Sequence, residues 1–198
     1  MKRDIILAGV GGQGVLSLAA IIARAAVSAG LQVRQSEVHG MAQRGGAVLA
    51  HLRISDSPIA SDLVPAGSAD LILSMEPVES LRYLGRLAPT GALVTAAEAF
   101  VNIPDYPDLA TIHDAIRRLP VYRLVEAERL AKEAGLPKAV NMVMVGAASP
   151  FLPVSADDLR STICELFASK EPSVVAANQA AFELGRLSGE KSDTESDK

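Results

Sequence analysis

Two glycine-rich segments near the start of the chain gather the residue types that could do chemistry. The first, Gly9-Val10-Gly11-Gly12-Gln13-Gly14, has the spacing G-x-G-x-x-G after an apolar run and before a helical pattern. In that context glycines allow a tight turn, and the N–H groups that open the following helix can bind an anion. The alternative is that these glycines only allow helix, strand and partner chain to pack closely.

The second segment, residues 36–46, carries four polar side chains followed by a glycine pair: Glu37, His39, Gln43 and Arg44, then Gly45 and Gly46. We expect it at the carboxyl end of a strand, where α/β proteins place their sites. Dinucleotide-binding proteins carry a ribose-binding acid about 20 residues after the glycine motif, and Glu37 lies near that position. His39 is a candidate base or positioning group, and Arg44 a candidate phosphate or carboxylate contact. The alternative is a loop whose polar groups satisfy its own backbone or dock a partner.

Outside these segments the sequence offers few catalytic groups. The three histidines lack metal-ligand spacing, so we expect no metal site, and neither G-x-S-x-G nor G-x-x-x-x-G-K-[ST] occurs. His51 and Arg53 alternate along an expected strand, where a solvated face or a subunit contact is the simplest interpretation. We assign no catalytic residue, and the sequence favours part of an enzyme over a whole one.

The elements that would position these residues follow from apolar periodicity. Apolar runs at 4–8, 71–75 and 92–95 predict strands buried on both faces, as in a parallel sheet. A helical pattern at 15–29 leads to a strand at 31–36, which completes a strand–helix–strand unit. The alternation at 47–55 predicts an antiparallel strand at an edge, paired with 58–61 as a hairpin.

The later segments complete an α/β fold. We expect a turn at 89–91, a strand at 121–124, and helices at 77–87, 111–119, 126–134, 141–148, 155–168 and 172–187. The predicted architecture is a three-layer α/β/α sandwich with a mostly parallel, mixed, Rossmann-like sheet. Residues 1–187 form one domain in this interpretation, and the polar segment 188–198 is expected to be a disordered tail.

Composition bounds the function further. Nineteen basic and 23 acidic side chains give a net charge of −4, which argues against a nucleic-acid or polybasic membrane surface. The single cysteine, Cys164, cannot form an internal disulfide or a four-thiolate iron–sulfur cluster, and it fits a reducing cytoplasm. No apolar stretch reaches 18 residues, so we expect a soluble, cytoplasmic protein.

The two glycine-rich motifs, together with Leu71-Ile72-Leu73-Ser74-Met75-Glu76-Pro77 and the 141–146 region, resemble the gamma-type domain of 2-oxoacid:ferredoxin oxidoreductases. Among these it is most similar to the small subunit of the indolepyruvate-oxidising enzymes, and the resemblance covers most of residues 1–187. It implies a subunit of an enzyme that converts a 2-oxoacid and coenzyme A to acyl-CoA and CO2 and passes electrons to ferredoxin.

The resemblance also implies the partners. Thiamine diphosphate and the iron–sulfur clusters would belong to a larger subunit, and this chain alone would bind no cofactor. Gly11–Gly14 and residues 37–46 would face that subunit or coenzyme A, and the same surfaces would be available for homodimer formation in the isolated chain. The alternatives are a freestanding NAD(P)-dependent dehydrogenase, based on Gly9, Gly11, Gly14 and Glu37, and a stand-alone binding module.

Overall fold

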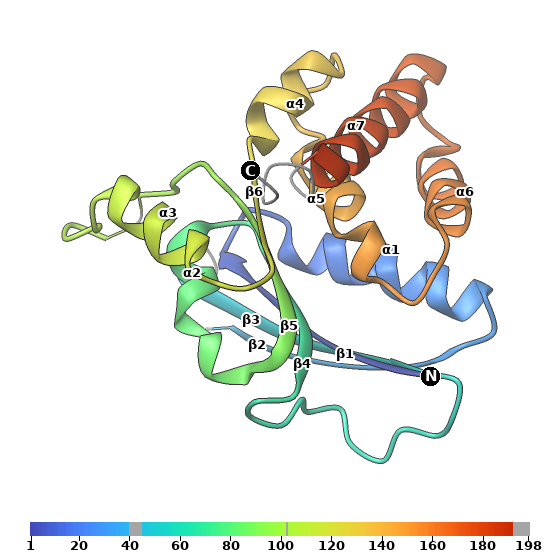
Figure 1. The fold of residues 1–198 in the computed structure, drawn as a ribbon. Helices are drawn as coiled ribbons and strands as arrows, with labels where there is room; N and C mark the ends of the chain where they lie inside the picture. Colours follow the sequence, from blue (N-terminus) through green and yellow to red (C-terminus); the bar gives the residue numbers. More distant parts are fainter. Residues whose placement is uncertain (40–44, 102, 192–198) are drawn as a thin grey trace.

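A six-stranded sheet crosses the centre of the molecule (Figure 1). The computed structural model describes residues 1–39, 45–101 and 103–191. The strands are β1 (Lys2–Val10), β2 (Gln32–His39), β3 (Ala47–Ser55), β4 (Ala69–Ser74), β5 (Leu87–Ala96) and β6 (Tyr122–Val125). The helices are α1 (Val15–Ser28), α2 (Pro77–Arg82), α3 (Leu109–Arg117), α4 (Ala127–Glu133), α5 (Val140–Ala148), α6 (Ala156–Phe167) and α7 (Pro172–Lys191), with 3-10 turns η1 (Leu84–Arg86) and η2 (Ser149–Phe151).

The strand order is β2-β3-β1-β4-β5-β6. β1, β4, β5 and β6 pair in parallel, whereas β3 runs antiparallel to both β1 and β2. The mixed sheet predicted from the sequence is therefore confirmed, as is the antiparallel direction of residues 47–55. The edge position predicted for that strand is wrong, because β3 lies between β1 and β2 and the edge belongs to β2.

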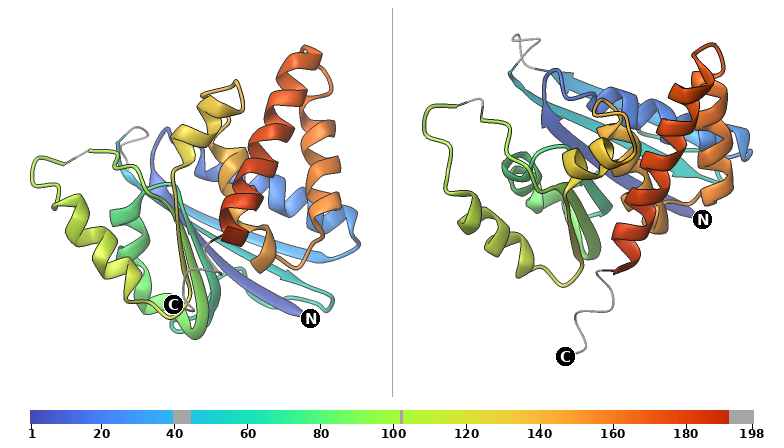
Figure 2. Two further views of the ribbon diagram at one scale, coloured as in Figure 1. Left: turned by 45° about the horizontal axis from the view of Figure 1, so that its top comes forward. Right: turned by 90° about the horizontal axis from the view of Figure 1, so that it is seen from above.

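Helices cover both faces of this sheet (Figure 2), as the three-layer prediction requires. Ile5 and Leu7 of β1 point into a core shared with α1 and α4–α7, whereas Ile6 points into a smaller core shared with α2 and α3. Alternate residues of one strand thus enter different cores, which is why the sequence of β1 is continuously apolar.

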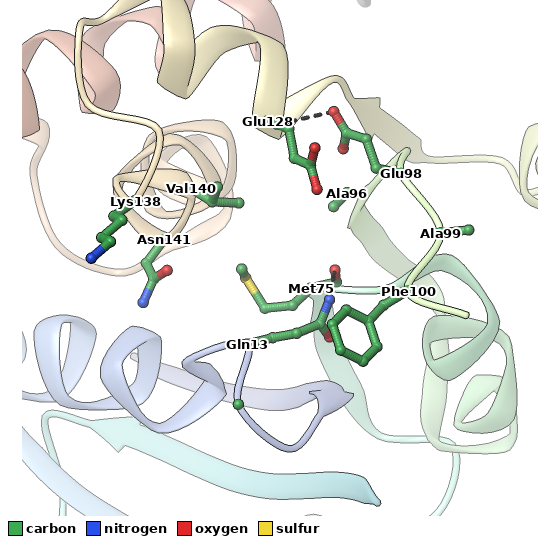
Figure 3. A pocket seen from close by; sticks show the side chains of 11 residues that line it. Gln13, Met75, Ala96, Glu98, Ala99, Phe100, Glu128, Lys138, Val140 and Asn141 are labelled. Carbon is green, nitrogen blue, oxygen red and sulfur yellow. Dashed lines mark hydrogen bonds between the residues drawn. The ribbon is translucent and has the colours of Figure 1, made fainter. Parts of the chain in front are cut away.

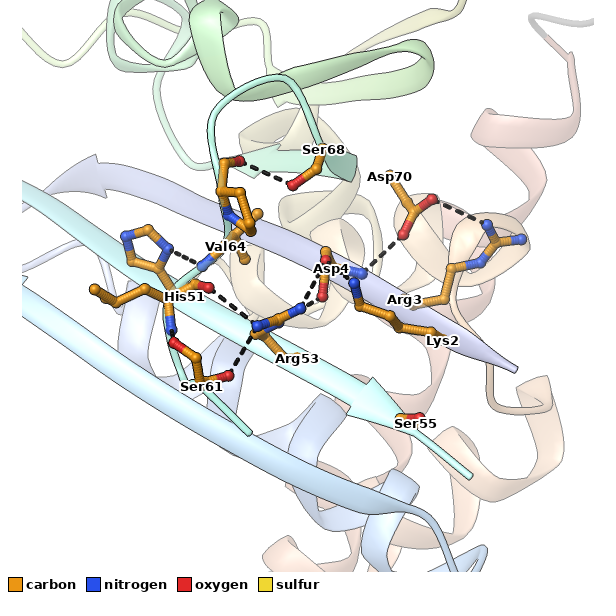
Figure 4. Close-up of polar contacts among 12 residues, drawn as sticks. Lys2, Arg3, Asp4, His51, Arg53, Ser55, Ser61, Val64, Ser68 and Asp70 are labelled. Carbon is orange, nitrogen blue, oxygen red and sulfur yellow. Dashed lines mark hydrogen bonds and ion pairs between the residues drawn. The ribbon is translucent and has the colours of Figure 1, made fainter. Parts of the chain in front are cut away.

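His51 and Arg53 do not form the solvated strand face that the sequence suggested. They are 2% and 8% exposed, respectively, and Figure 4 shows them beneath the connection from β3 to β4. The Arg53 guanidinium donates from Nε and Nη2 to the two carboxylate oxygens of Asp4, at 2.7 and 3.2 Å. This buried pair joins β3 to the first residues of β1.

The connection from β3 to β4, residues 56–68, contains no strand, so the hairpin predicted at 58–61 is wrong. Arg53 Nη1 donates to the carbonyl oxygens of Ser61 and Leu63, at 2.9 and 3.1 Å. His51 Nδ1 accepts from the Val64 amide at 3.0 Å. Side chains of β3, rather than a neighbouring strand, therefore satisfy the backbone groups of this connection.

The turn predicted at 89–91 is also wrong, because these residues lie inside β5. A Cβ on Gly91 would come 2.6 Å from the Ala69 carbonyl oxygen of β4, so only glycine allows the two backbones to approach here. The pairing of β4 with β5 shifts register at the same place, between Ala69 and Leu71. The glycine that suggested a turn marks a close backbone contact instead.

α5 is buried from Met142 to Ala148 and packs against α7, the last helix. A Cβ on Gly146 would lie 2.0 Å from the Phe182 carbonyl oxygen, and one on Gly185 would lie 2.0 Å from the Val143 carbonyl oxygen. The two helices therefore touch backbone to backbone. None of the helices in the described part of the chain has the length and apolar character needed to cross a bilayer.

Candidate functional site

The glycine-rich turn connects the carboxyl end of β1 to α1. Gly14 is the N-cap of α1 and has a φ of 83°, a left-handed conformation that favours glycine. No side chain caps this helix, and its first turn contains no acidic residue. A Cβ on Gly14 would come within 2.5 Å of Asn141 Nδ2, so glycine is required for space as well as for conformation.

The turn is joined to the end of the second glycine-rich segment. The Gly11 amide donates to the Gly46 carbonyl at 2.8 Å, and the Gly45 amide donates to the Gly11 carbonyl at 3.2 Å. The structure thus brings Gly11 and Gly45 together, as expected if the two motifs form one surface. Gln43 and Arg44 lie outside the described residues, and for His39 only the backbone, paired with Val48 in β2, is described.

Gln13, which the motif offered as a ligand contact, bonds to the backbone. Its Oε1 accepts from the Val10 amide at 2.8 Å, and its Nε2 donates to the Met75 carbonyl at 3.1 Å. The side chain therefore fastens the end of β1 to the end of β4. Its role in the described structure is to fix the shape of the turn.

Glu37 does not reach the place of a ribose-binding acid. In dinucleotide-binding folds the second strand lies beside the first, which brings that acid next to the glycine turn. Here β3 is inserted between β1 and β2, and Glu37 pairs with Ala50 on the far side of it. Since strands are spaced about 4.8 Å apart, this insertion moves the acid one strand away from the turn.

A pocket of about 360 Å³ opens where the carboxyl ends of β1, β4 and β5 meet the starts of α4 and α5 (Figure 3). This is the edge at which open α/β sheets bind ligands. Gly12 and Gln13 form part of its wall. The other lining residues are Met75, Ala96, Glu98, Ala99, Phe100, Glu128, Lys138, Val140 and Asn141.

Glu98 is the best-anchored acid in this pocket. Its carboxylate oxygens accept from the Ala127 amide at 3.2 Å and the Glu128 amide at 3.0 Å, so it caps the start of α4. A carboxylate already occupies the N-terminus of α4, which leaves that end unavailable to an anionic ligand. The positive group of the pocket is Lys138, which makes no ion pair within the described ranges.

Two exposed apolar side chains lie next to the pocket: Phe100 lines it, and Val101 is the next residue in the chain. Phe100 and Val101 are 44% and 68% exposed in the connection that follows β5. The same connection is anchored by Tyr106, whose hydroxyl donates to the buried Glu76 carboxylate of α2. Burial and this carboxylate raise the pKa of Tyr106, so the phenol keeps its proton. Large apolar side chains presented to solvent beside a pocket are typical of a protein contact surface.

Sequence reasoning located the glycine turn but missed Glu98, Phe100 and Lys138. Glu98 and Phe100 directly follow β5, and the rule that places sites after the carboxyl ends of strands would have included them. Lys138 and Asn141 carry no such signal, because they reach the pocket only through the packing of α5 against α1.

The groups that the resemblance implies do not fit this chain. An iron–sulfur cluster takes about four cysteine ligands, whereas the chain has one cysteine. No group of three or more His, Cys, Asp or Glu side chains in the described residues is arranged to hold a metal ion, such as the one that accompanies a diphosphate. No reaction step can therefore be assigned to a cofactor held by these residues alone.

Fold and site together define an α/β domain with an open pocket at the carboxyl ends of its strands. The family model described as pyruvate ferredoxin/flavodoxin oxidoreductase matches residues 4–188. The chain is 38% identical over 194 residues to "Indolepyruvate oxidoreductase subunit IorB" of Pyrococcus horikoshii, covering 93% of this chain and 94% of that protein. It is 32% identical over 189 residues to "2-oxoglutarate synthase subunit KorC" of Methanothermobacter thermautotrophicus, covering 94% of each chain.

Solved structures support the same assignment of the fold. The 2-oxoglutarate:ferredoxin oxidoreductase of Magnetococcus marinus, solved with 2-oxoglutarate, coenzyme A and succinyl-CoA bound, matches 96% of this chain with a TM-score of 0.74 and 23% identity. This chain spans 31% of that longer one. Pyruvate oxidoreductase subunit PORC of Thermotoga maritima matches 94% of this chain and 96% of its own, with a TM-score of 0.68 and 22% identity.

The chain belongs to the pyruvate ferredoxin/flavodoxin oxidoreductase family. It is a subunit of a 2-oxoacid:ferredoxin oxidoreductase, as the resemblance predicted. The alternative of a freestanding NAD(P)-dependent dehydrogenase is wrong. Its structural basis is also missing, because the inserted β3 separates Glu37 from the glycine turn.

Proposed function

We propose that residues 1–187 form the gamma-type domain of a small, cofactor-free subunit of a cytoplasmic enzyme. The enzyme oxidatively decarboxylates an aryl 2-oxoacid such as indolepyruvate, forms an acyl-CoA and CO2, and reduces ferredoxin. Thiamine diphosphate and the iron–sulfur clusters belong to the larger partner subunit. The observation that carries the proposal is the 38% identity to the indolepyruvate oxidoreductase subunit of Pyrococcus horikoshii over nearly the whole length of both chains.

The surface that meets the larger subunit is the strand-end face, defined here as residues 9–14 with Gly45, Phe100 and Val101. Three features support this choice. Gly12 is exposed, the adjoining pocket is open, and the two apolar side chains beside it face solvent. Apolar side chains beside a pocket are the usual anchors of a protein interface.

Arg44 and His39 are proposed on residue type alone. Arg44 binds a phosphate or carboxylate of coenzyme A or of the partner, and His39 positions the segment that carries it. Gly45, the residue that follows Arg44 in the sequence, bonds to the glycine turn.

Co-expression with the larger subunit tests the interface. Phe100→Glu puts a charge where the interface buries an apolar ring, and we expect at least a tenfold loss of complex recovered on a tag. Leu63→Glu is the matched control, because Leu63 is also exposed (51%) but lies in the connection from β3 to β4. Equal recovery of both variants would remove the strand-end face from the interface.

The reconstituted complex tests the substrate and the role of Arg44. Ferredoxin reduction is measured with indolepyruvate, phenylpyruvate, 2-oxoglutarate and pyruvate in turn. We expect the aryl oxoacids to give the highest kcat/KM, and a preference for 2-oxoglutarate would instead group the chain functionally with the KorC relatives. Arg44→Ala is expected to raise the KM for coenzyme A. An unchanged KM together with unchanged assembly would exclude both roles of this residue.

A further inference from the structure

A second pocket, of about 480 Å³, opens between helices α1, α5, α6 and α7 and adjoins the strand-end pocket at Lys138 and Asn141. Its walls are mainly apolar: Ala20, Ile21, Leu136, Met142, Leu166, Phe167 and Val174. Ile21 and Met142 are each 3% exposed at its base, whereas Leu166 is 37% exposed at its rim. We call this pocket the helix groove. Its size and lining are typical of a site for a small molecule with an apolar body.

One polar side chain inside the groove has a free acceptor. Asn178 of α7 lines the groove and is 3% exposed. Its Nδ2 donates to the Val174 carbonyl at 2.8 Å. Its amide oxygen accepts no hydrogen bond from the residues that the structure describes. This oxygen is not sealed from solvent, so it can accept a hydrogen bond from water or from a donor on a molecule bound in the groove.

A cation stands at the opening of the groove. Lys138 lines it and is exposed, and in the described part of the chain it has no carboxylate within ion-pairing distance. Figure 3 shows its side chain turned away from Glu98 and Glu128, the acids of the strand-end pocket. Lys138 is therefore available to a carboxylate bound in the helix groove.

We propose that the helix groove binds an apolar monocarboxylate whose ring carries an N–H or O–H donor. The apolar body fills the space between Ile21, Met142 and Phe167, the ring donor bonds to the Asn178 amide oxygen, and the carboxylate pairs with Lys138. An apolar segment of a partner chain would fill the walls but would leave both polar groups without a partner, which is why a small acid is the better occupant.

This ligand belongs to the same chemical class as the aryl 2-oxoacid proposed above. The role of the groove in the enzyme rests on the proposed function. The chemical class of its ligand is inferred from the residues that line the groove. Because the strand-end pocket is lined by different side chains apart from Lys138 and Asn141, the groove is a separate site on the small subunit. The groove contacts α1 at Ser17, Ala20 and Ile21, near the end of the helix that carries the glycine turn.

Titration calorimetry of the purified full chain tests the proposal with indole-3-acetate, which has both polar groups and does not react. We expect binding in the submillimolar range. Naphthalene-1-acetate, which lacks the N–H, should bind about fivefold more weakly, the size of one net hydrogen bond. Tryptamine, in which an ammonium replaces the carboxylate, should not bind. Lys138→Gln should weaken indole-3-acetate about fivefold, and Lys132→Gln on α4 is the matched control.

Two further variants locate the ligand. Ala20→Phe, at an exposed position of α1, fills the helix groove and should abolish binding, whereas Ala99→Phe narrows only the strand-end pocket and should leave binding unchanged. Equal binding of tryptamine, or loss of binding in Ala99→Phe but not in Ala20→Phe, would overturn the proposal. The proposal would also be overturned if no carboxylate binds and Ala20→Phe fails to assemble with the larger subunit. The groove would then be a contact surface for that subunit. None of these outcomes depends on the activity of the assembled enzyme, so the groove and the proposed function can fail separately.

Discussion

At the amino end of β1, Asp4 is 1% exposed and is held by both Arg53 and Lys2. Beyond the carboxyl end of the same strand, Gly12 is exposed and Lys138 has no ion-pair partner in the described ranges. β1 thus runs between two different regions. At its amino end the charged groups named here form ion pairs, and beyond its carboxyl end polar and apolar groups are exposed to solvent. Removing one partner of a buried pair at the first end should destabilise the fold, whereas the open groups at the other end belong to the surface proposed to meet the larger subunit.

The largest expected loss of stability comes from removing Arg53, which pairs with Asp4 at the amino end of β1. Arg53→Met leaves the buried Asp4 carboxylate with Lys2 as its remaining cation, and Lys2 is 54% exposed. We expect the free energy of unfolding to fall by about 3 kcal/mol, as when one member of a buried ion pair is removed. Urea denaturation measures the loss. Arg3→Met is the control, because the Arg3–Asp70 pair is exposed and 3.4 Å long, and it should change stability by less than about 0.5 kcal/mol.

The second effect falls at a position of the open end that is packed against another element, Gly14 beside Asn141. Gly14→Ala forces a side chain into a left-handed conformation and toward Asn141 Nδ2. A loss of about 2 kcal/mol is expected, combining conformational strain with the close contact. The double variant Gly14→Ala/Asn141→Ala removes the contact and keeps the strain. If the double variant is no more stable than Gly14→Ala, Asn141 does not restrict this position.

The third effect is a pH dependence of the paired end. Burial, chiefly, and the nearby Arg86 and Arg53 lower the pKa of His51 in the folded chain. The unfolded chain therefore binds a proton more readily, and the free energy of unfolding should decrease as the pH falls below about 6.5, the pKa of an unperturbed histidine. The loss should be about 1 kcal/mol, the size of one net hydrogen bond, because a protonated ring cannot accept from the Val64 amide.

Denaturation at pH 7.5 and at pH 5.5 measures this dependence, with His51→Gln as the variant that cannot titrate. His113 provides the comparison: it is half-buried, and its Nε2 lies 2.8 Å from the Ala97 carbonyl oxygen. If His113→Gln removes the pH dependence and His51→Gln does not, the assignment to His51 is wrong.

The smallest effects on stability belong to the open end. Gly12 has a φ of 103°, and a Cβ there would meet no atom within 4 Å, so Gly12→Ala should lower stability by about 1 kcal/mol through strain alone. Complex formation with the larger subunit should nevertheless fall severalfold, because the added methyl group protrudes into the strand-end pocket. Normal complex formation by Gly12→Ala would show that the open end is not the contact surface. Lys138→Gln should leave stability within about 0.5 kcal/mol.

Much of the fold could be predicted from local patterns. The apolar runs of β1 and β4, and Ser155 as the N-cap of α6, with its capping box to Asp158, have their causes within a few residues. The position of β3 could not be predicted, since it depends on pairing with both β1 and β2, which local patterns do not encode. Gly91 was misread for a similar reason, because its neighbour is the backbone of another strand.

The candidate site divides in the same way. The glycine turn could be recognised from its spacing, but the role of Gln13 depends on the Met75 carbonyl, which comes from a different strand. Glu37 has the spacing of a ribose-binding acid, yet its distance from the turn depends on strand order, which spacing does not encode. No local pattern marks Asn178, because only tertiary packing buries it beside an apolar groove.

The backbone contact between α5 and α7 has a consequence for synthesis. α5 is apolar on nearly every side, and the helix that covers it is the last described element to leave the ribosome. Until residues beyond Gly185 have emerged, the apolar side chains of α5 that α7 covers in the folded chain stay exposed to solvent. Chaperone binding during translation should therefore concentrate late, on intermediates that already carry a complete sheet.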